Sequence, residues 1–148
     1  MSTSALRVCV GLGCDRGTPL ATLQQALGEA LAKAGAQLSQ VAAAASITLK
    51  ADEPGLLALA RELGWSLIFY TPAQLASVPV PNPSETVRKY TGTPSVSEAA
   101  ALLVGATVTG GAQALPMATL LVEKFKCRGV DGRNATVSIA CCSAVLNS

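Results

Sequence analysis

A glycine-rich segment near the N-terminus carries the residue types best suited to hold an anion. Gly11, Gly13 and Gly17 surround Arg16, directly after an apolar run and before a helical pattern. Free backbone N–H groups and the helix dipole favour an anion at such a strand–loop–helix junction, and an arginine can bind a carboxylate or phosphate at two points. A tight turn that only needs glycines explains the same spacing, so both interpretations stay open.

The same segment does not match the common nucleotide-binding patterns. A dinucleotide fingerprint needs G-x-G-x-x-G, and here Arg16 stands where the last glycine should be. The Gly-Lys-Ser/Thr ending of a P-loop is also missing. A nucleotide-binding module is therefore the least favoured function.

Lys50, Asp52 and Glu53 stand together just before Pro54, at the expected start of a helix. Asp52 or Glu53 could simply cap that helix, with Lys50 in solvent. Alternatively, Lys50 contacts an anion and one carboxylate acts as a catalytic acid or base. The spacing does not choose between these two roles.

Two more helix entrances are rich in small and polar residues. Ser84 can cap one short helix, and Ser95 with Glu98 three residues later has the spacing of a capping box. In an open α/β sheet such entrances gather at the carboxyl ends of the strands, where ligands bind. We therefore expect several donor-rich helix ends to share one rim, suited to a ligand with many carboxylates.

Lys124 and Lys126 flank Phe125 in a predicted strand. Because side chains alternate between the two faces of a strand, both lysines should share one face and Phe125 should lie on the other. Exposed lysines on an edge strand that discourage aggregation would explain this pattern equally well.

Positioning these residues requires alternating strands and helices, which the hydrophobic pattern predicts. Strands are predicted at 6–10, within 41–49, and at 67–70, 120–125 and 136–140, although the alanines after 41 also permit a helix. Helices are predicted at 19–34 with a cap at Thr18, from 52–54 to Gly64, and at 84–90 and 95–104. Four prolines make 72–83 irregular, and 107–116 reads as a surface loop. Asp131-Gly132 predicts a terminal hairpin, so the sheet should be mixed.

The composition limits the classes of function. With 148 residues, half of them hydrophobic and 14% charged, we expect a single α/β domain over 1–148. Aromatic residues make up only 3% and the net charge is +2, which argues against nucleic-acid binding. Neither a signal peptide nor a membrane-spanning run is recognisable, so we expect a cytoplasmic protein.

The chain has five cysteines, no Cys-x-x-Cys pair and no histidine. This argues against a structural zinc site and a Cys-His nucleophile, so free, buried thiols are expected. We expect no metal site and no cofactor. Cys14 is the exception to follow, because it lies in the glycine-rich segment.

Four segments, taken in order, resemble the CobE/CbiG C-terminal domain family of cobalamin biosynthesis. They are GLGCDRGTP, ITLKADEPGL, NPSETVRKYTGTPSVSEAAALL, and LLVEKFKCRG followed by NATVSIA. The ordered set covers most of the chain and is more specific than any single glycine-rich loop.

The resemblance implies a three-layer α/β/α domain with a mixed sheet that works on the corrin ring during vitamin B12 synthesis. Full-length CbiG opens a ring lactone and releases acetaldehyde, and this chain is too short for its N-terminal part. A stand-alone member of the family is therefore expected, whose partner is a corrin-pathway tetrapyrrole intermediate. Hand-over to other cobalamin-biosynthesis enzymes is a further expectation, and the missing histidine removes one ligand for ring cobalt.

Position by position, the resemblance implies two groups of site residues. Those expected to bind the ligand are Gly11, Gly13, Cys14, Arg16, Gly17, Ser84, Gly92, Ser95, Val96, Glu98 and Lys124. Those expected to be catalytic, if the protein is a precorrin hydrolase, are Lys50, Asp52 and Glu53. Asp15 departs from the family, which usually has arginine there, and would repel a ligand carboxylate unless it pairs with Arg16 or a neighbour.

Three functions follow from these expectations. The first is binding of a polycarboxylate intermediate such as a precorrin or hydrogenobyrinic acid. The second is hydrolysis of a ring lactone or release of acetaldehyde, and the third is nucleotide binding.

Overall fold

A five-stranded sheet forms the middle of the computed structural model, which describes residues 6–142. Its strands are β1 (Val8–Cys14), β2 (Val41–Ile47), β3 (Ile68–Tyr70), β4 (Leu120–Arg128) and β5 (Asn134–Cys141). They lie in the order β3-β2-β1-β5-β4. The first three strands are parallel, and β5 runs antiparallel to both β1 and β4. The predicted mixed sheet is confirmed.

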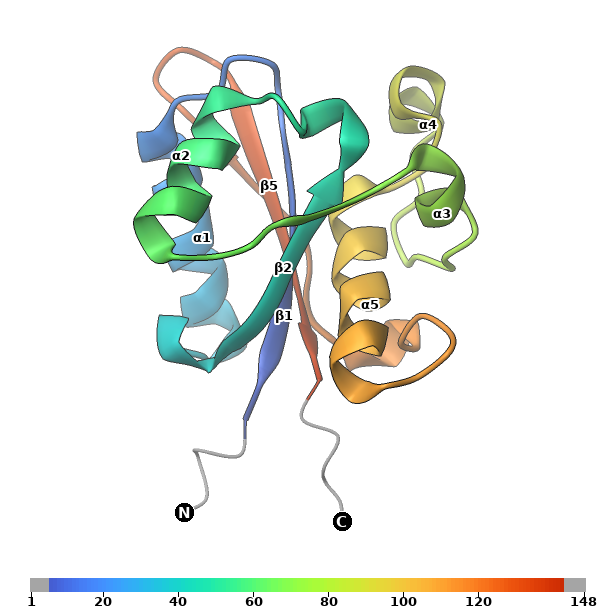
Figure 1. The fold of residues 1–148 in the computed structure, drawn as a ribbon. Coiled ribbons are helices and arrows are strands. Elements are labelled where there is room, and N and C mark those ends of the chain that lie inside the picture. The colour runs from blue at the N-terminus through green and yellow to red at the C-terminus, as the bar shows by residue number, and fades with distance from the viewer. Residues whose placement is uncertain (1–5, 143–148) are drawn as a thin grey trace.

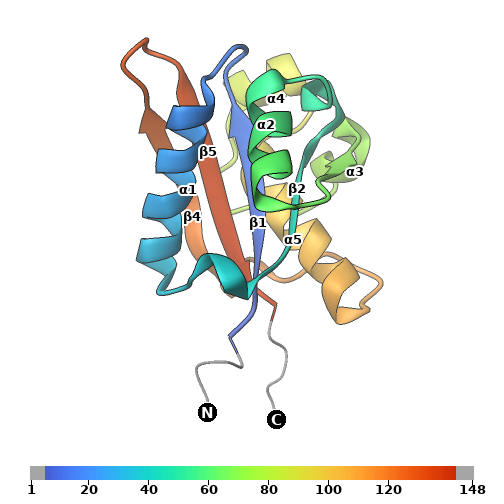
Figure 2. The same cartoon turned by 60° about the vertical axis from the view of Figure 1, so that its left-hand side comes forward.

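Helices cover both faces of this sheet (Figure 1). On one face lie α1 (Leu20–Ala34) and α2 (Pro54–Leu63); on the other lie α5 (Val96–Thr109) and the short α3 (Pro72–Ala76) and α4 (Glu85–Thr91). Figure 2 shows α1 lying along β4 and β5. The three-layer α/β/α fold is confirmed.

The alternation of side chains along β1 explains why both faces are covered. Val8, Val10 and Leu12 point to one face and belong to the core formed with α1 and α2. Cys9 points to the other face and belongs to the core beneath α5. Because both faces of β1 are fully buried, this strand forms the centre of the domain.

Gly11 faces α5 at very short range. A Cβ atom at this position would stand 1.8 Å from the Ser97 carbonyl oxygen and 2.7 Å from the Ala101 nitrogen. Alanines along the facing side of α5 are fully buried, so the helix backbone rests almost directly on the sheet. Gly11 is thus a packing residue of the central strand.

Three sequence predictions are corrected by the structure. β1 continues to Cys14, so the first half of the expected glycine loop is strand: it pairs with β5 as far as Cys14, and Gly11 also pairs with β2. α5 continues to Thr109, so the loop predicted at 107–116 begins only at Gly110. Residues 72–76 form α3, because Pro72 occupies the first turn and Thr71 caps it with a capping box.

Helix ends follow the local signals with two exceptions. Gly35 and Gly64 end α1 and α2 in the left-handed conformation, as their positions predict. Pro19, not Thr18, is the N-cap of α1, and the Thr18 hydroxyl donates to the Asp15 carbonyl at 2.7 Å. Ser95 caps α5 by position only, because its hydroxyl donates to Glu98 instead of accepting from the helix.

Within residues 6–142, no helix combines the length and apolar character needed to cross a bilayer.

Candidate functional site

A cavity of about 570 Å³ opens where β1 and β2 end and α4 and α5 begin. This is the carboxyl edge of the parallel strands, where α/β sheets bind ligands. Its volume lies within the usual range for small-molecule sites. The cavity is therefore the leading candidate for the functional site among the described residues.

The lining combines apolar surface with donors. The apolar side chains are Ile47, Leu49, Val87, Tyr90 and Val96. The hydroxyl groups come from Ser84, Thr86, Thr91, Ser95, Ser97 and Thr136. Four cations, Arg16, Lys50, Lys124 and Lys126, face a single carboxylate, Asp15, in the described lining. Such a surface suits an anion that also has a large apolar body.

The structure brings eight of the fourteen expected site residues to this cavity. They are Gly13, Cys14, Arg16, Lys50, Ser84, Ser95, Val96 and Lys124. The other six, Gly11, Gly17, Asp52, Glu53, Gly92 and Glu98, are not in its lining. Contacts with other parts of the chain explain most of these placements.

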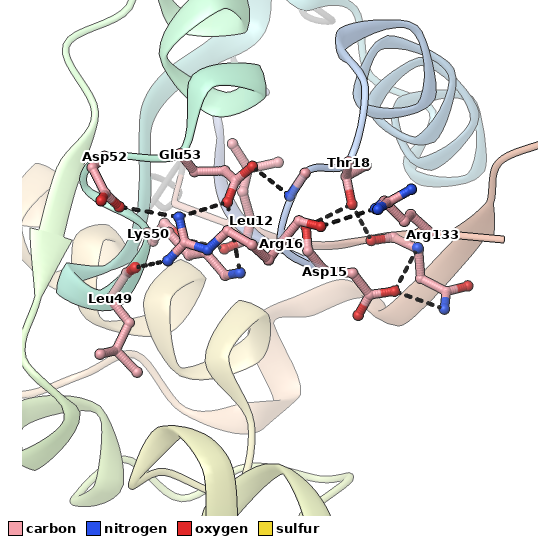
Figure 3. Close-up of polar contacts among 12 residues, drawn as sticks. Leu12, Asp15, Arg16, Thr18, Leu49, Lys50, Asp52, Glu53 and Arg133 are labelled. Carbon is pink, nitrogen blue, oxygen red and sulfur yellow. Dashed lines mark hydrogen bonds and ion pairs between the residues drawn. The ribbon is translucent and has the colours of Figure 1, made fainter. Parts of the chain in front are cut away.

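Glu53 is completely buried and holds the turn after β1 (Figure 3). Its Oε2 accepts a hydrogen bond of 2.9 Å from the backbone N–H of Gly17. Its Oε1 has no hydrogen bond but lies 3.0 Å from Nη1 of Arg16 in an ion pair. The anion held by this glycine turn is thus the protein's own Glu53 carboxylate.

Arg16 is also committed to the protein. Its Nη1 donates to Asp52 at 3.1 Å, and its Nη2 donates to the Leu49 carbonyl at 3.1 Å (Figure 3). The hydrogen bond to Asp52 raises the pKa of the guanidinium group. Asp52 itself is 83% exposed. Arg16 therefore joins the turn after β1 to the entrance of α2 and stays charged.

Lys50 lies beside this group and is largely covered. Its side chain is 16% exposed, and its Nζ lies 3.9 Å from Oε1 of Glu53. Lys50 thus lines the cavity while its charge is partly balanced by a buried carboxylate.

Asp15 is hydrogen-bonded to Asn134, the first residue of β5. Its Oδ2 accepts hydrogen bonds from the backbone nitrogen of Asn134 at 2.8 Å and from Nδ2 of Asn134 at 3.2 Å. The neighbour that partners this carboxylate is therefore Asn134 and not Arg16.

Glu98 is a second buried carboxylate with a structural network. It accepts hydrogen bonds from Ser95 Oγ at 2.9 Å, from Asn82 Nδ2 at 2.6 Å and from the Lys124 backbone nitrogen at 3.1 Å. These bonds join the start of α5, the segment before α4 and strand β4. Glu98 therefore holds these three segments, which border the cavity, in place relative to one another, although Glu98 is not itself a lining residue.

Gly17 and Gly92 are required by the conformation of the backbone. Both have positive φ angles, 83° and 84°, which favour glycine. Gly92 ends α4, and a Cβ there would stand 2.9 Å from Cβ of Pro72.

The predicted division of β4 between two faces is confirmed. Lys124 and Lys126 both line the cavity, whereas Phe125 packs into the core on the α1 side, with Lys33 Nζ 5.4 Å from its ring centroid. The Nζ of Lys124 donates to the Asn82 carbonyl at 2.8 Å.

None of the five cysteines forms a disulfide. Burial raises the pKa of Cys14 to about 11, so this thiol is protonated at neutral pH. A raised pKa is the opposite of what a cysteine nucleophile needs.

Sequence reasoning missed Tyr90 and Thr136 as lining residues. Tyr90 extends from α4 and is 76% exposed. Thr136 shares the cavity face of the sheet because it pairs with Gly13 on one side and Lys126 on the other. Only the strand register could have identified it.

In the described part of the chain, no group of three or more His, Cys, Asp or Glu residues could hold a metal ion.

The family model described as cobalamin synthesis G C-terminus matches residues 8–140. A cobalt-precorrin-5A hydrolase of Priestia megaterium is 42% identical over 96 residues, which are 65% of this chain and 26% of that protein. A protein CobE of Sinorhizobium sp is 40% identical over 96 residues, which are 64% of this chain and 62% of that protein. The matches thus span about a quarter of one curated relative and less than two thirds of the other.

The chain is also similar to solved structures of cobalamin biosynthesis proteins. The crystal structure of CobE, a protein from the cobalamin biosynthetic pathway, is 34% identical with a TM-score of 0.76, covering 97% of this chain and 93% of that one. The cobalamin biosynthesis protein chiG of Agrobacterium tumefaciens is 25% identical with a TM-score of 0.56, covering 88% and 96%. A cobalamin biosynthesis protein G homologue of Sulfolobus solfataricus, 16% identical with a TM-score of 0.58, covers 91% and 37% and shares the fold.

Proposed function

Because the chain belongs to the cobalamin synthesis G C-terminal family of cobalamin biosynthesis proteins, we propose that its cavity binds a polycarboxylate intermediate of the corrin pathway. The observation that carries this proposal is the lining, in which four cations face one carboxylate around an apolar floor. A corrin intermediate has the matching chemistry, since carboxylates surround a broad apolar ring.

The cation arrangement supports a ligand with several carboxylates. Lys50 stands where β2 ends, and Lys124 and Lys126 stand on β4 at the edge of the sheet, whereas Arg16 in the same lining is already paired with Asp52 and Glu53. Hydrogen bonds between the ammonium groups of these lysines and ligand carboxylates are stronger than those between neutral groups. The apolar residues between them can contact the ring.

The geometry favours binding over hydrolysis. Asp52 and Glu53 were the expected acid–base groups, yet both are outside the cavity lining and paired with Arg16. The carboxylate in the described lining, Asp15, accepts two hydrogen bonds from Asn134. A general base must reach the proton that it removes, and neither Asp52 nor Glu53 borders the space in which a ligand would lie.

The geometry disfavours nucleotide binding as well. A phosphate cradle needs free backbone N–H groups, and the Gly17 N–H is bonded to Glu53. Residues 11–14 pair with neighbouring strands instead of forming a loop.

The proposal is tested by titrating the protein with hydrogenobyrinic acid and following the absorbance of the corrin. We expect a saturable change at low salt, and a weaker response with cobinamide, whose peripheral carboxylates are amidated. Thr86→Trp fills the cavity from α4 and should weaken binding, whereas Lys89→Trp, on the same helix but outside the lining, should not. Absence of saturable binding by the wild-type protein contradicts the proposal.

A further inference from the structure

The three strands β1, β5 and β4 place one row of residues across the cavity side of the sheet. Gly13 pairs with Thr136 in the β1–β5 ladder, and Thr136 pairs with Lys126 in the β5–β4 ladder. All three residues line the cavity. Directly paired residues have neighbouring side chains, so the side chains of Thr136 and Lys126 start next to each other at one end of the row.

These two donors are available to a ligand. Arg16 is bonded to Asp52, Glu53 and Leu49, as described above, and the other two cavity lysines also have protein partners. Within residues 6–142, neither the Lys126 ammonium nor the Thr136 hydroxyl has a hydrogen bond or ion pair. A ligand carboxylate can therefore bind Lys126 and Thr136 without displacing a contact of the protein.

Gly13 leaves room for the rest of the ligand. A Cβ on Gly13 would meet only Val96, at 3.7 Å from Cγ1, so the missing side chain opens the floor of the cavity beside Thr136. An apolar ring edge can rest over Gly13 while its substituent extends along the row toward Lys126.

We propose that Lys126 and Thr136 form the carboxylate-recognition end of the cavity, in place of Arg16 and the glycine-rich segment. Lys126 supplies the charge and Thr136 a directional hydrogen bond to the same carboxylate. This inference rests on the proposed function, because it assigns the specificity of the same cavity.

The test compares two lysine substitutions that change the net charge equally. Lys126→Met removes the ammonium group and keeps most of the apolar stem, and Lys89→Met removes an exposed lysine outside the cavity lining. We expect Lys126→Met to weaken hydrogenobyrinic acid binding about two- to fivefold, the upper part of the range for a solvent-exposed charge pair. Lys89→Met should leave it unchanged, and the loss in Lys126→Met should shrink at high salt because of screening.

Thr136→Val tests the second donor with little change in shape. We expect binding about two- to fivefold weaker, and a double-mutant cycle with Lys126→Met should give a combined loss smaller than the product of the single losses, because both donors hold one group. If wild type binds and Lys126→Met binds like Lys89→Met, this inference is wrong and the proposed function stands. If wild type shows no saturable binding, the proposed function is wrong and the inference fails with it.

Discussion

Replacing Gly11 by alanine should destabilise the fold without touching the cavity. The added Cβ would stand 1.8 Å from the Ser97 carbonyl oxygen and 2.7 Å from the Ala101 nitrogen, so the α5 backbone must move away from β1. Overpacking typically costs about 1–3 kcal/mol. Here the obstacle is helix backbone and not a flexible side chain, so we expect about 3 kcal/mol. For a chain of this size that lowers Tm by roughly 6–12 °C.

The measurement is urea unfolding followed by circular dichroism and by the fluorescence of Trp65, the only tryptophan. Gly28→Ala is the matched control, because a Cβ at this exposed position in α1 meets nothing within 4 Å. The same chemical change there should stabilise by about 0.5–1 kcal/mol, because glycine is less favourable than alanine within a helix. The two variants should thus move the midpoint in opposite directions.

One result would refute the reasoning about Gly11. If Gly11→Ala unfolds at the wild-type urea concentration but no longer binds hydrogenobyrinic acid, the residue contacts the ligand and the close approach of α5 is wrong. If it is destabilised and its folded fraction still binds with wild-type affinity, Gly11 is a packing residue.

Three further predictions concern the buried and half-buried titratable groups. Glu53→Gln should lower the free energy of unfolding by about 2 kcal/mol. This is less than the usual loss when one partner of a buried ion pair is removed, because Arg16 is 60% exposed. An unchanged urea midpoint would show that the Glu53 carboxylate does not stabilise the fold. Glu98→Gln should cost about 1–3 kcal/mol, since an amide has one acceptor oxygen for several donors, and urea unfolding again gives the value. Cys14 has a pKa of about 11 in the folded protein against an ordinary 9.0, so its contribution to stability is complete below pH 9 and is lost as pH rises toward 11. Cys14→Ala should therefore reduce the alkaline fall in Tm, and alkylation of Cys14 at pH 8 should be about a hundredfold slower than that of a free thiol.

Local signals predicted most of the secondary structure. Pro54 in the first turn of α2 and the left-handed glycines after α1 and α2 act within a few residues, so their effect can be read along the chain. The alternation of Lys124, Phe125 and Lys126 likewise predicted two faces of β4 correctly. The loop predicted at 107–116 is present from Gly110 to Pro116, and only its first three residues were wrong, because they extend α5 by one more turn before Gly110 ends the helix in the left-handed conformation.

The glycine-rich segment shows most clearly what required the tertiary structure. By itself the sequence determined that a strand leads through glycines and Arg16 into a helix, because strand formers, glycines and helix periodicity are local properties. It did not determine that Gly11 lies under α5 or that the Glu53 carboxylate occupies the Gly17 N–H, because both partners are distant in sequence. The row from Gly13 to Lys126 likewise exists only through the register of three strands. Residue types set which chemistry is available, and long-range packing decides which groups the protein uses itself and which remain for a ligand.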